Sequence, residues 1–379
     1  MNNMLSSSGI YVHIPFCRKK CDYCDFYSLP VSNESVMDDY LDALILQMKD
    51  YSLGGIKYPA DTLYIGGGTP SLFGEKRLGV LIREIRKQFD LSEKAEITVE
   101  VNPESAGKSL FKALKRSGVN RISIGVQSSD NAQLAMLGRV HSYETAVNAV
   151  SLCREYCCDN ISLDLIYGLP DQDLESWARS LKDIVSLEPK HISCYALTPA
   201  ENTPIYKIRD TLPDDDVVAD MYLYAVEALK RKGFFQYEVS NFSQKGYESK
   251  HNLKYWSMKP YIGLGAAAHS FFGNKRFSVI KDLGEYIRRM RSGDPVIEDA
   301  DDTDCIDRVG EYIMLGLRKV SGIDTEDFYK TFGTDFGPYA ERLEKYVERG
   351  YAVHEGSVFR LDPRGLFVSN TIISDVLDI

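Results

Sequence analysis

The sequence lacks the features that would place a protein in a membrane, in an oxidising compartment or on nucleic acid. Its 379 residues contain no apolar run near the roughly 20 residues that cross a bilayer. The polar stretch before residue 10 is too short for a signal peptide. Its 55 acidic side chains outnumber its 45 basic ones, and the formal charge of −10 disfavours a broad basic surface. We therefore expect a cytoplasmic protein with no transmembrane segment and no nucleic-acid partner.

Cysteine is scarce and unevenly distributed, with eight residues in the chain. Three of them, Cys17, Cys21 and Cys24, lie in one short segment with the spacing C-x3-C-x2-C. The rest are scattered, and we interpret them as buried or incidental thiols of a reducing compartment. These scattered cysteines are Cys153, Cys157, Cys158, Cys194 and Cys305.

The C-x3-C-x2-C spacing predicts a metal centre. Thiolates suit iron–sulfur clusters, and three of them leave one iron of a [4Fe–4S] cube without a protein ligand. Radical S-adenosylmethionine (SAM) proteins use such an open iron to chelate the amino acid part of SAM. A structural zinc site, with His13 or a distant residue as the fourth ligand, is the alternative. Zinc is disfavoured because structural zinc sites usually use two separated cysteine pairs, and the chain has no second C-x2-C.

Short apolar runs alternate with amphipathic ones through the first two thirds of the chain. The apolar runs are rich in β-branched residues and predict buried parallel strands, while the amphipathic runs predict helices. We expect an α/β fold, a partial (β/α)6 barrel over residues 1–240. The predicted strands are Gly9–Ile14, Thr62–Ile65, Glu96–Val101, Arg121–Val126, Asn160–Ile166 and His191–Ala196. The predicted helices are Val36–Tyr51, Lys76–Phe89, Lys108–Ser117, Tyr143–Tyr156 and Leu174–Leu187.

The remaining third is predicted to form two parts. Residues 241–300 are rich in Gly, Asn, Ser and aromatics and are interpreted as a loop-rich connecting segment. Residues 301–379 show three helical patterns, two short strand patterns and a last helix, which predict a smaller α+β, winged-helix-like domain. Its sixteen acidic and nine basic side chains argue against DNA binding. We interpret it as a packing or lid module.

Glycines and polar residues follow the predicted strands, at the end where barrel proteins build their sites. The turn Gly66–Pro70 follows the second strand, and its glycines would let a ligand approach the backbone closely. Glu100, Gln127 and Asp164 lie at the ends of the next three strands. We expect these residues to surround one site together with the cysteine loop.

An ordered set of motifs carries a resemblance to a known family over nearly the whole chain. The motifs are Tyr11-Val-His-Ile-Pro-Phe-Cys17, Ile65-Gly-Gly-Gly-Thr-Pro-Ser71, Glu100-Val-Asn-Pro103, Ile124-Gly-Val-Gln127-Ser, Leu137-Gly-Arg139-Val-His141 and Asp164-Leu-Ile-Tyr-Gly-Leu-Pro170. Together they resemble the oxygen-independent coproporphyrinogen III oxidase family of radical SAM proteins. The ordered set is far more specific than any single motif.

Within that family, the chain is more similar to the heme chaperone (HemW-type) branch than to the decarboxylating oxidases. The oxidases resemble C-x3-C-x2-C-x-C, and Phe26 stands here at the place of their additional cysteine. Only ten residues precede Tyr11, whereas the oxidases carry a longer extension. The element His251-Asn252-x-x-Tyr255-Trp256 matches a motif of the chaperone branch. The alternative is the oxidase activity, a SAM-dependent decarboxylation to protoporphyrinogen IX. Whether the chain is an enzyme is left open. A radical SAM enzyme acting on tRNA is a weaker third reading.

The resemblance implies roles for individual residues. The three clustered cysteines would ligate the [4Fe–4S] cluster. Gly67, Gly68 and Thr69 would meet the methionine part of SAM. Further SAM-binding residues would be Tyr11, Tyr23, Glu100, Gln127, Arg139 and Asp164.

The same resemblance implies heme as a ligand and protein partners. His251 lies among aromatic residues and is predicted to lie near heme, with direct ligation of the iron left open. His13, His141 and His269 are the other candidate ligands. The expected partners are a heme-acceptor protein and an electron donor such as a flavodoxin or ferredoxin.

Overall fold

The protein is described by a computed structural model that covers residues 7–31, 33–302 and 305–379. Its central element is a 12-stranded sheet in which β1 and β4 to β8 are parallel neighbours. Across the sheet the order is β14 (Ile297–Asp302), β13 (Lys275–Val279), β12 (His269–Phe272), β11 (Tyr261–Leu264), β1 (Ser8–Ile14), β4 (Pro59–Gly67), β5 (Asp90–Val101), β6 (Arg121–Gln127), β7 (Ile161–Tyr167), β8 (His191–Ala196), β10 (Asn241–Ser243) and β9 (Phe235–Gln236).

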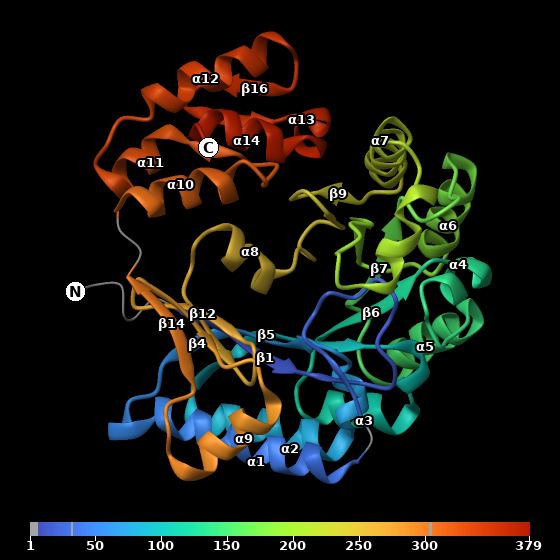
Figure 1. Cartoon of the computed structure of the whole chain (residues 1–379), viewed down its shortest axis with the longest axis vertical. Helices are drawn as coiled ribbons and strands as arrows, with labels where there is room; N and C mark the ends of the chain where they lie inside the picture. Colours follow the sequence, from blue (N-terminus) through green and yellow to red (C-terminus); the bar gives the residue numbers. More distant parts are fainter. Residues whose placement is uncertain (1–6, 32, 303–304) are drawn as a thin grey trace.

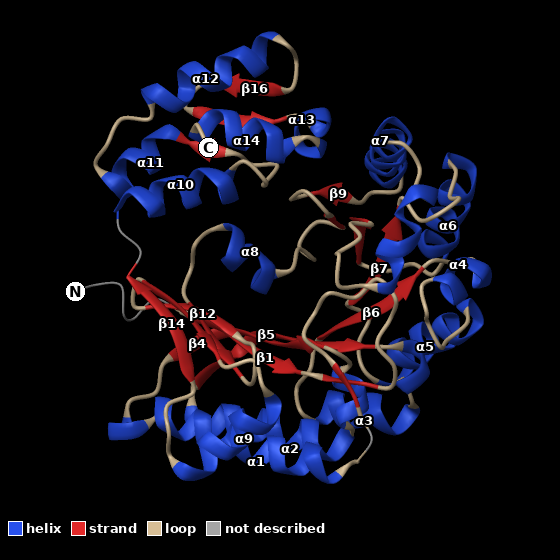
Figure 2. Ribbon diagram, in the orientation of Figure 1, coloured by secondary structure: helices blue, strands red, loops and turns tan. Residues whose placement is uncertain are grey.

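Helices cover the outer face of this curved sheet (Figures 1 and 2). Ile10, Val12 and Ile14 of β1 are fully buried, and the residues between them are buried or half-buried, as expected for a parallel strand covered on both faces. The main covering helices are α1 (Ser35–Tyr51), α2 (Glu75–Gln88), α3 (Lys108–Arg116), α5 (Tyr143–Tyr156), α6 (Leu174–Ser186), α7 (Asp215–Arg231) and α9 (Leu283–Ser292), and the short α4 (Asn131–Met136) follows the carboxyl end of β6. The predicted partial barrel is confirmed, and each predicted strand overlaps an observed one.

The segment over residues 241–300, expected to be loop-rich, instead extends the sheet. Strand β11 pairs in parallel with β1 on the side opposite β4, and β12 to β14 continue from it in antiparallel order. Helix α8 (Lys250–Trp256) precedes them. Sequence analysis missed the short strand β11 because Gly263 interrupts its apolar run. A Cβ atom on Gly263 would clash with the His269 carbonyl, so the close approach of β12 requires glycine.

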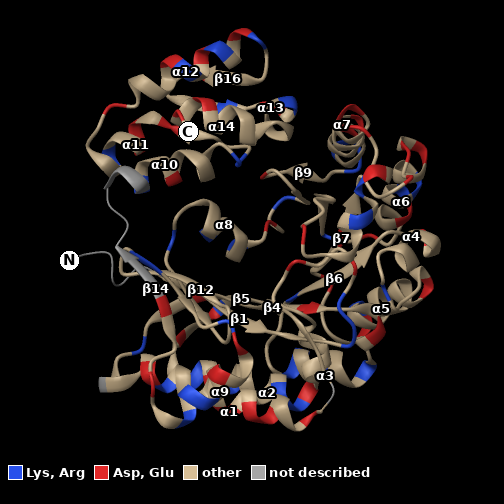
Figure 3. Cartoon of the chain, in the orientation of Figure 1, with Lys and Arg blue, Asp and Glu red and all other residues tan. Residues whose placement is uncertain are grey.

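The C-terminal part forms a separate layer of helices around a three-stranded antiparallel sheet with the order β15–β17–β16. Buried Phe328, Leu343 and Phe359 are part of its core. Both acidic and basic side chains lie on its helices α11 and α12 (Figure 3). The predicted order of elements is found, with two differences. The two-residue strand β15, which is too short for a periodic signal, is added, and the last helix is divided into α13 and α14. The elements are α10 (Cys305–Gly316), β15 (Ile323–Asp324), α11 (Thr325–Phe332), α12 (Gly337–Glu348), β16 (Ala352–Glu355), β17 (Val358–Leu361), α13 (Pro363–Phe367) and α14 (Ser369–Leu377).

None of the helices in the described ranges combines the length and apolar character that crossing a bilayer requires.

Buried Tyr40 fixes helix α1 to two parts of the sheet. Its hydroxyl donates to the His13 carbonyl over 2.8 Å and accepts from the Ala266 backbone N–H over 3.0 Å. Its ring packs edge-on against Phe16, with the ring centroids 5.4 Å apart. The hydroxyl therefore satisfies two buried backbone groups, one at the end of β1 and one after β11.

We predict that Tyr40→Phe lowers the free energy of unfolding by about 1–3 kcal/mol, because it leaves these two backbone groups unsatisfied. The measurement is the midpoint of urea unfolding of the purified chain. Tyr224→Phe is the matched control, since Tyr224 is 39% exposed, and its effect should stay below about 0.5 kcal/mol. Equal midpoints for Tyr40→Phe and the wild type would contradict the role given to the hydroxyl.

Candidate cofactor site

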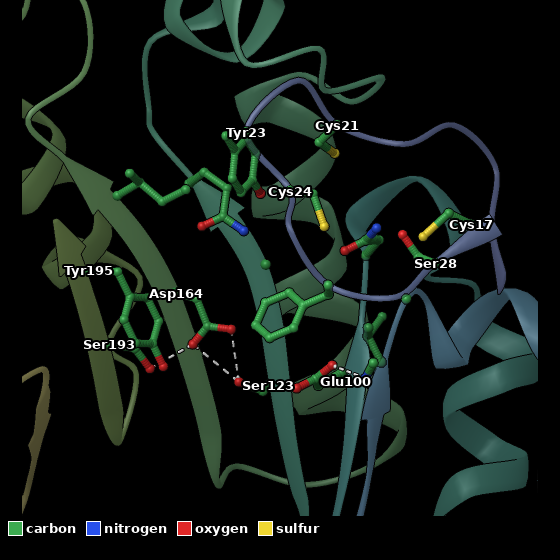
Figure 4. A pocket seen from close by; sticks show the side chains of 18 of the residues that line it. Cys17, Cys21, Tyr23, Cys24, Ser28, Glu100, Ser123, Asp164, Ser193 and Tyr195 are labelled. Carbon is green, nitrogen blue, oxygen red and sulfur yellow. Dashed lines mark hydrogen bonds between the residues drawn. The ribbon is translucent and has the colours of Figure 1, made fainter. Parts of the chain in front are cut away.

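A pocket of about 570 Å³ opens at the carboxyl ends of the parallel strands, between the sheet and the cysteine loop. In Figure 4 the cysteines lie along the loop on one side, and Glu100 and Asp164 lie on the strands facing it. Sequence analysis placed its candidates at this rim, and most of them line the pocket. These are Cys17, Cys21, Tyr23, Cys24, Gly67, Gly68, Glu100, Gln127, Arg139 and Asp164.

The cysteine loop is held against the glycine-rich turn after β4. The backbone N–H groups of Gly68 and Thr69 donate to the Ile14 and Phe16 carbonyls over 2.8 and 2.7 Å. A Cβ atom on Gly68 would lie 2.8 Å from the Phe16 carbonyl oxygen and 3.0 Å from the Cys17 sulfur. Glycine is therefore required here, because any side chain would push the loop and its first cysteine away from the turn.

The three cysteines are free thiols, and all of them face the pocket. The Thr69 hydroxyl donates to the Cys17 sulfur over 3.4 Å, and Arg139 donates to the Cys21 sulfur over 3.5 Å. Burial raises the pKa of Cys17 and of Cys24. These donors would offset the negative charge of thiolates bound to a metal centre.

The arrangement of the thiols fits a cluster better than a single zinc ion. His13, the zinc ligand considered from the sequence, is engaged elsewhere, with hydrogen bonds to the Tyr11 hydroxyl and the Tyr27 carbonyl. Three soft thiolates spread around one cavity are a donor set for an iron–sulfur cluster.

Glu100 occupies the pocket wall opposite the cysteines. Its carboxylate accepts a hydrogen bond of 2.7 Å from the Tyr64 hydroxyl and one of 3.1 Å from the Gly67 backbone N–H. Burial raises the pKa of Glu100 to about 7, and the nearby charge of Asp164 adds to this effect against the hydrogen bond from Tyr64. Glu100 therefore exchanges a proton near neutral pH while it keeps lone pairs toward the pocket.

Asp164 is surrounded by serine hydroxyls from the neighbouring strands. It accepts hydrogen bonds from Ser193 over 2.7 Å and from Ser123 over 3.0 Å. Burial raises the pKa of Asp164, and these hydrogen bonds oppose the rise. Sequence analysis missed the two serines. Their signal is the inward-facing alternation on β6 and β8, where Ser193 pairs directly with Asp164 in the sheet register.

Arg139 connects the rim of the sheet to the cysteine loop. Its guanidinium donates to the Gly125 carbonyl over 2.8 Å and to the Asn102 side chain over 3.1 Å. Asn102 in turn donates to Thr69 over 3.0 Å. Gln127 lies beside this network at a bulge of β6, with a φ of 68° that is unusual for a residue other than glycine. Sequence analysis did not single out Asn102.

Arg121 is a cation deep in the pocket that sequence analysis counted only as part of a strand. Its side chain is 2% exposed and forms no hydrogen bond or ion pair with any residue that the structure describes. His191 lies nearby, with its ring nitrogens bonded to the Ser162 and Tyr237 hydroxyls. Burial and the charge of Arg121 lower the pKa of His191, so its ring is neutral. The charge of Arg121 acts on Glu100 and Asp164 and opposes the rise that burial causes in their pKa values. Its guanidinium lines the pocket, where it is available to an anionic group of a ligand.

Tyr11 and Thr69 lie behind the pocket rather than on its wall. The Tyr11 ring stacks against Tyr64 with a centroid distance of 6.3 Å, and its hydroxyl bonds His13. Thr69 is buried and contacts the pocket through Cys17 and Asn102. Direct contact of Tyr11 and Thr69 with SAM stays a prediction.

His251 is fully buried at the start of helix α8, outside this pocket. Its ring nitrogens bond the Thr62 and Tyr255 hydroxyls, each over 2.8 Å. Burial lowers the pKa of His251 to about 3, so the ring is neutral. The structure gives His251 a bridging position between α8 and β4, and its predicted contact with heme stays a prediction. Its neighbour Asn252 does line the pocket.

Comparison with known proteins places the chain in a family. The Radical SAM superfamily matches residues 11–184, and the HemN C-terminal domain matches residues 304–368. The heme chaperone HemW of Bacillus subtilis is 34% identical over 376 residues, which cover 97% of this chain and 98% of that protein. HemW of Escherichia coli K12 is 32% identical, covering 96% and 97%. The chain belongs to the HemW family of radical SAM proteins. This confirms the resemblance found in the motifs.

A solved structure shows the same fold. The coproporphyrinogen III oxidase HemN of Escherichia coli, a radical SAM enzyme, superposes with a TM-score of 0.87 over 98% of this chain and 90% of that chain. Its sequence is only 21% identical, so this likeness concerns the fold alone. Membership of the radical SAM superfamily implies a [4Fe–4S] cluster and SAM, and the thiols of the pocket fit this implication.

We predict that Cys24→Ala abolishes the broad visible absorption of the cluster after anaerobic reconstitution with iron and sulfide. Two thiolates leave two irons of a cube without protein ligands, and such a site should lose its metal. The matched control is Cys158→Ala, because Cys158 lies after α5 and its thiol donates to the Asn160 carbonyl. Retention of a full cluster by Cys24→Ala would contradict the assignment.

We also predict that Glu100→Gln stabilises the metal-free chain more at pH 8 than at pH 5.5. The folded-state pKa of about 7 lies above the ordinary value of 4.5, so ionisation costs stability as the pH rises between them. The gain at pH 8 should exceed the gain at pH 5.5 by about 1–2 kcal/mol, allowing for water in the pocket. Thermal unfolding at both pH values measures it, with exposed Glu93→Gln as control. A gain independent of pH would contradict the raised pKa.

Proposed function

We propose that this chain is a cytoplasmic heme chaperone that holds a [4Fe–4S] cluster and SAM in the barrel pocket, binds heme, and transfers it to an acceptor protein. The observation that carries the proposal is the convergence of three free thiols with Glu100, Arg139 and Asp164 on one pocket. The curated relatives named as heme chaperones support the same assignment.

Different residues of the pocket would hold the cluster and SAM. Cys17, Cys21 and Cys24 would ligate the cluster, and the turn with Gly67 and Gly68 would admit SAM close to the backbone. When bound, the cluster and SAM supply one-electron chemistry at a carbon–sulfur bond. The protein would contribute position and electrostatics, because the loop and the turn are joined by backbone hydrogen bonds.

Charged and amide side chains would orient SAM on the strand side of the pocket. Arg139 is already fixed by the Gly125 carbonyl and Asn102, so its guanidinium would meet a carboxylate without losing much side-chain freedom. Glu100 and Asp164 would accept hydrogen bonds from an amino group or from ribose hydroxyls. Gln127 would hold its strained conformation because the surrounding strands impose it.

Phe26 supports the chaperone over the oxidase. It stands at the place of the additional cysteine of the oxidase motif, and its side chain is 70% exposed at the edge of the pocket. The loop therefore presents an aromatic ring there rather than a further thiol. The second candidate, an oxygen-independent coproporphyrinogen III oxidase, is favoured by the match to the HemN C-terminal domain. The acceptor protein and an electron donor, such as a flavodoxin or ferredoxin, complete the proposal.

We predict that the anaerobically reconstituted chain binds one equivalent of heme saturably and does not decarboxylate coproporphyrinogen III. Visible absorption during titration with hemin measures binding, and chromatography of porphyrins after incubation with SAM and a reductant measures turnover. Serum albumin at the same concentration controls for non-specific heme uptake. Sustained conversion of coproporphyrinogen would replace the chaperone with the oxidase, and absence of saturable heme binding would remove the chaperone.

A further inference from the structure

A second pocket, of about 630 Å³, lies outside the site described above. Its walls come from the loop after α8, from the end of β12, and from helices α10 and α11 of the C-terminal part. Figure 1 shows α8 between the sheet and these C-terminal helices. Its volume lies within the range of about 300–1,000 Å³ that is usual for small-molecule sites.

The second pocket is unusually basic for a chain with a net charge of −10. Lys259, Arg308 and Lys319 all line it, and none of them forms a side-chain hydrogen bond or ion pair with a residue that the structure describes. The Nε atom of Arg308 is buried without a partner. Burial lowers the pKa of Lys319, and the charge of Lys259 lowers it further. Three cations on the wall of one cavity, without an ion-pair partner among the described residues, indicate a site for an anion.

One carboxylate also lines the second pocket, but it is already paired. The Asp327 carboxylate forms an ion pair with the Lys330 ammonium on the same helix, with 3.0 Å between nitrogen and oxygen. This pair is neutral as a unit, so among the residues that the structure describes it leaves Lys259, Arg308 and Lys319 without a carboxylate partner. A ligand with two carboxylates would offset most of their charge.

Aromatic rings form the apolar part of the second pocket. Tyr312 and Phe332 meet edge to face, with centroids 5.4 Å apart, on the C-terminal side. Phe272 lies on the sheet side, packed edge-on against Tyr58 with centroids 4.9 Å apart. Aromatic side chains from two sides of one cavity suit a flat, apolar ring system.

Met258 adds a soft ligand to the same wall. It follows α8 in the left-handed conformation, with a φ of 49°, which a long side chain seldom adopts. Thioether sulfur is one of the axial ligands that iron porphyrins accept. Aromatic walls, cations for two carboxylates and a thioether are together the requirements of an iron porphyrin.

We propose that the second pocket binds heme, with its ring between the aromatic walls and its propionates on Lys259, Arg308 and Lys319. Met258 is the side chain available to the iron. The proposal rests on the proposed function and gives it a location. Heme would then lie apart from the cluster and SAM, beside the C-terminal helices rather than inside the barrel.

The test is a titration with hemin of the reconstituted full-length chain and of the double variant Lys259→Glu/Lys319→Gln. Loss of two charge-assisted contacts should raise the dissociation constant at least about tenfold. Lys87→Glu/Lys94→Gln is the matched control, because it makes the same charge change at exposed positions and should bind like the wild type. Circular dichroism checks the fold of each variant. If Lys259→Glu/Lys319→Gln does not fold, the single variant Lys259→Glu takes its place.

A second ligand separates charge recognition from apolar adsorption. The dimethyl ester of hemin lacks both carboxylates, so the wild type should bind it at least about tenfold more weakly than hemin. The ester should bind equally to the wild type and the double variant. In addition, Met258→Leu should change the heme spectrum while leaving the fold intact.

The outcomes distinguish the location from the function. Saturable heme binding that is unchanged in the double variant would overturn the second pocket and leave the chaperone assignment standing. Equal affinity of the wild type for hemin and its ester would likewise overturn it. Absence of saturable heme binding by the wild type would overturn both.

Discussion

The contact between the cysteine loop and the glycine-rich turn is the constraint on which the cofactor site depends. The loop can approach the turn only because Gly68 has no side chain, and the Ile14 and Phe16 carbonyls then bond the turn directly. That approach places the Thr69 hydroxyl on the Cys17 sulfur. From Thr69, hydrogen bonds continue through Asn102 to Arg139, which returns to the Cys21 sulfur. The loop is thus positioned from both ends by the rim of the sheet.

The interior of the barrel carries charge that folding alone would not favour. Glu100 and Asp164 are carboxylates whose pKa values are raised by burial against the opposing charge of Arg121, and Arg121 forms no hydrogen bond or ion pair within the described residues. Removing such groups from water costs several kcal/mol each unless they are compensated. A chain selected only for stability would place apolar side chains at these positions. Three buried charged groups around one cavity therefore point to a polar ligand there.

Sequence patterns predicted those parts of the molecule that depend on local periodicity or on strand ends. The parallel strands have continuous apolar runs, and the residues that follow them must meet at one rim, so Glu100, Gln127 and Asp164 were found. Arg121 and Ser123 were missed because a polar residue inside a strand gives no sign of which neighbours it will face. Strand β11 was missed because Gly263 breaks its short apolar run. The second pocket combines residues from 257 to 332, and only the tertiary arrangement brings them together.

Helix α8 offers a physical connection between His251 and the second pocket. The Glu96 carboxylate accepts the N–H groups of Lys250 and His251 at the start of this helix, and the His251 ring bonds Thr62 of β4. Lys254 forms an ion pair of 2.7 Å with Asp61. These contacts fix the position of α8, a helix of seven residues. They therefore also fix where its last turn ends and the loop with Met258 and Lys259 begins. Substituting His251 would therefore disturb the second pocket without His251 touching its ligand.

In that case, loss of heme binding by a His251 variant would not by itself identify an iron ligand. Iron ligation has to be read from the heme spectrum, whereas positioning through α8 would appear as a changed affinity with an unchanged spectrum.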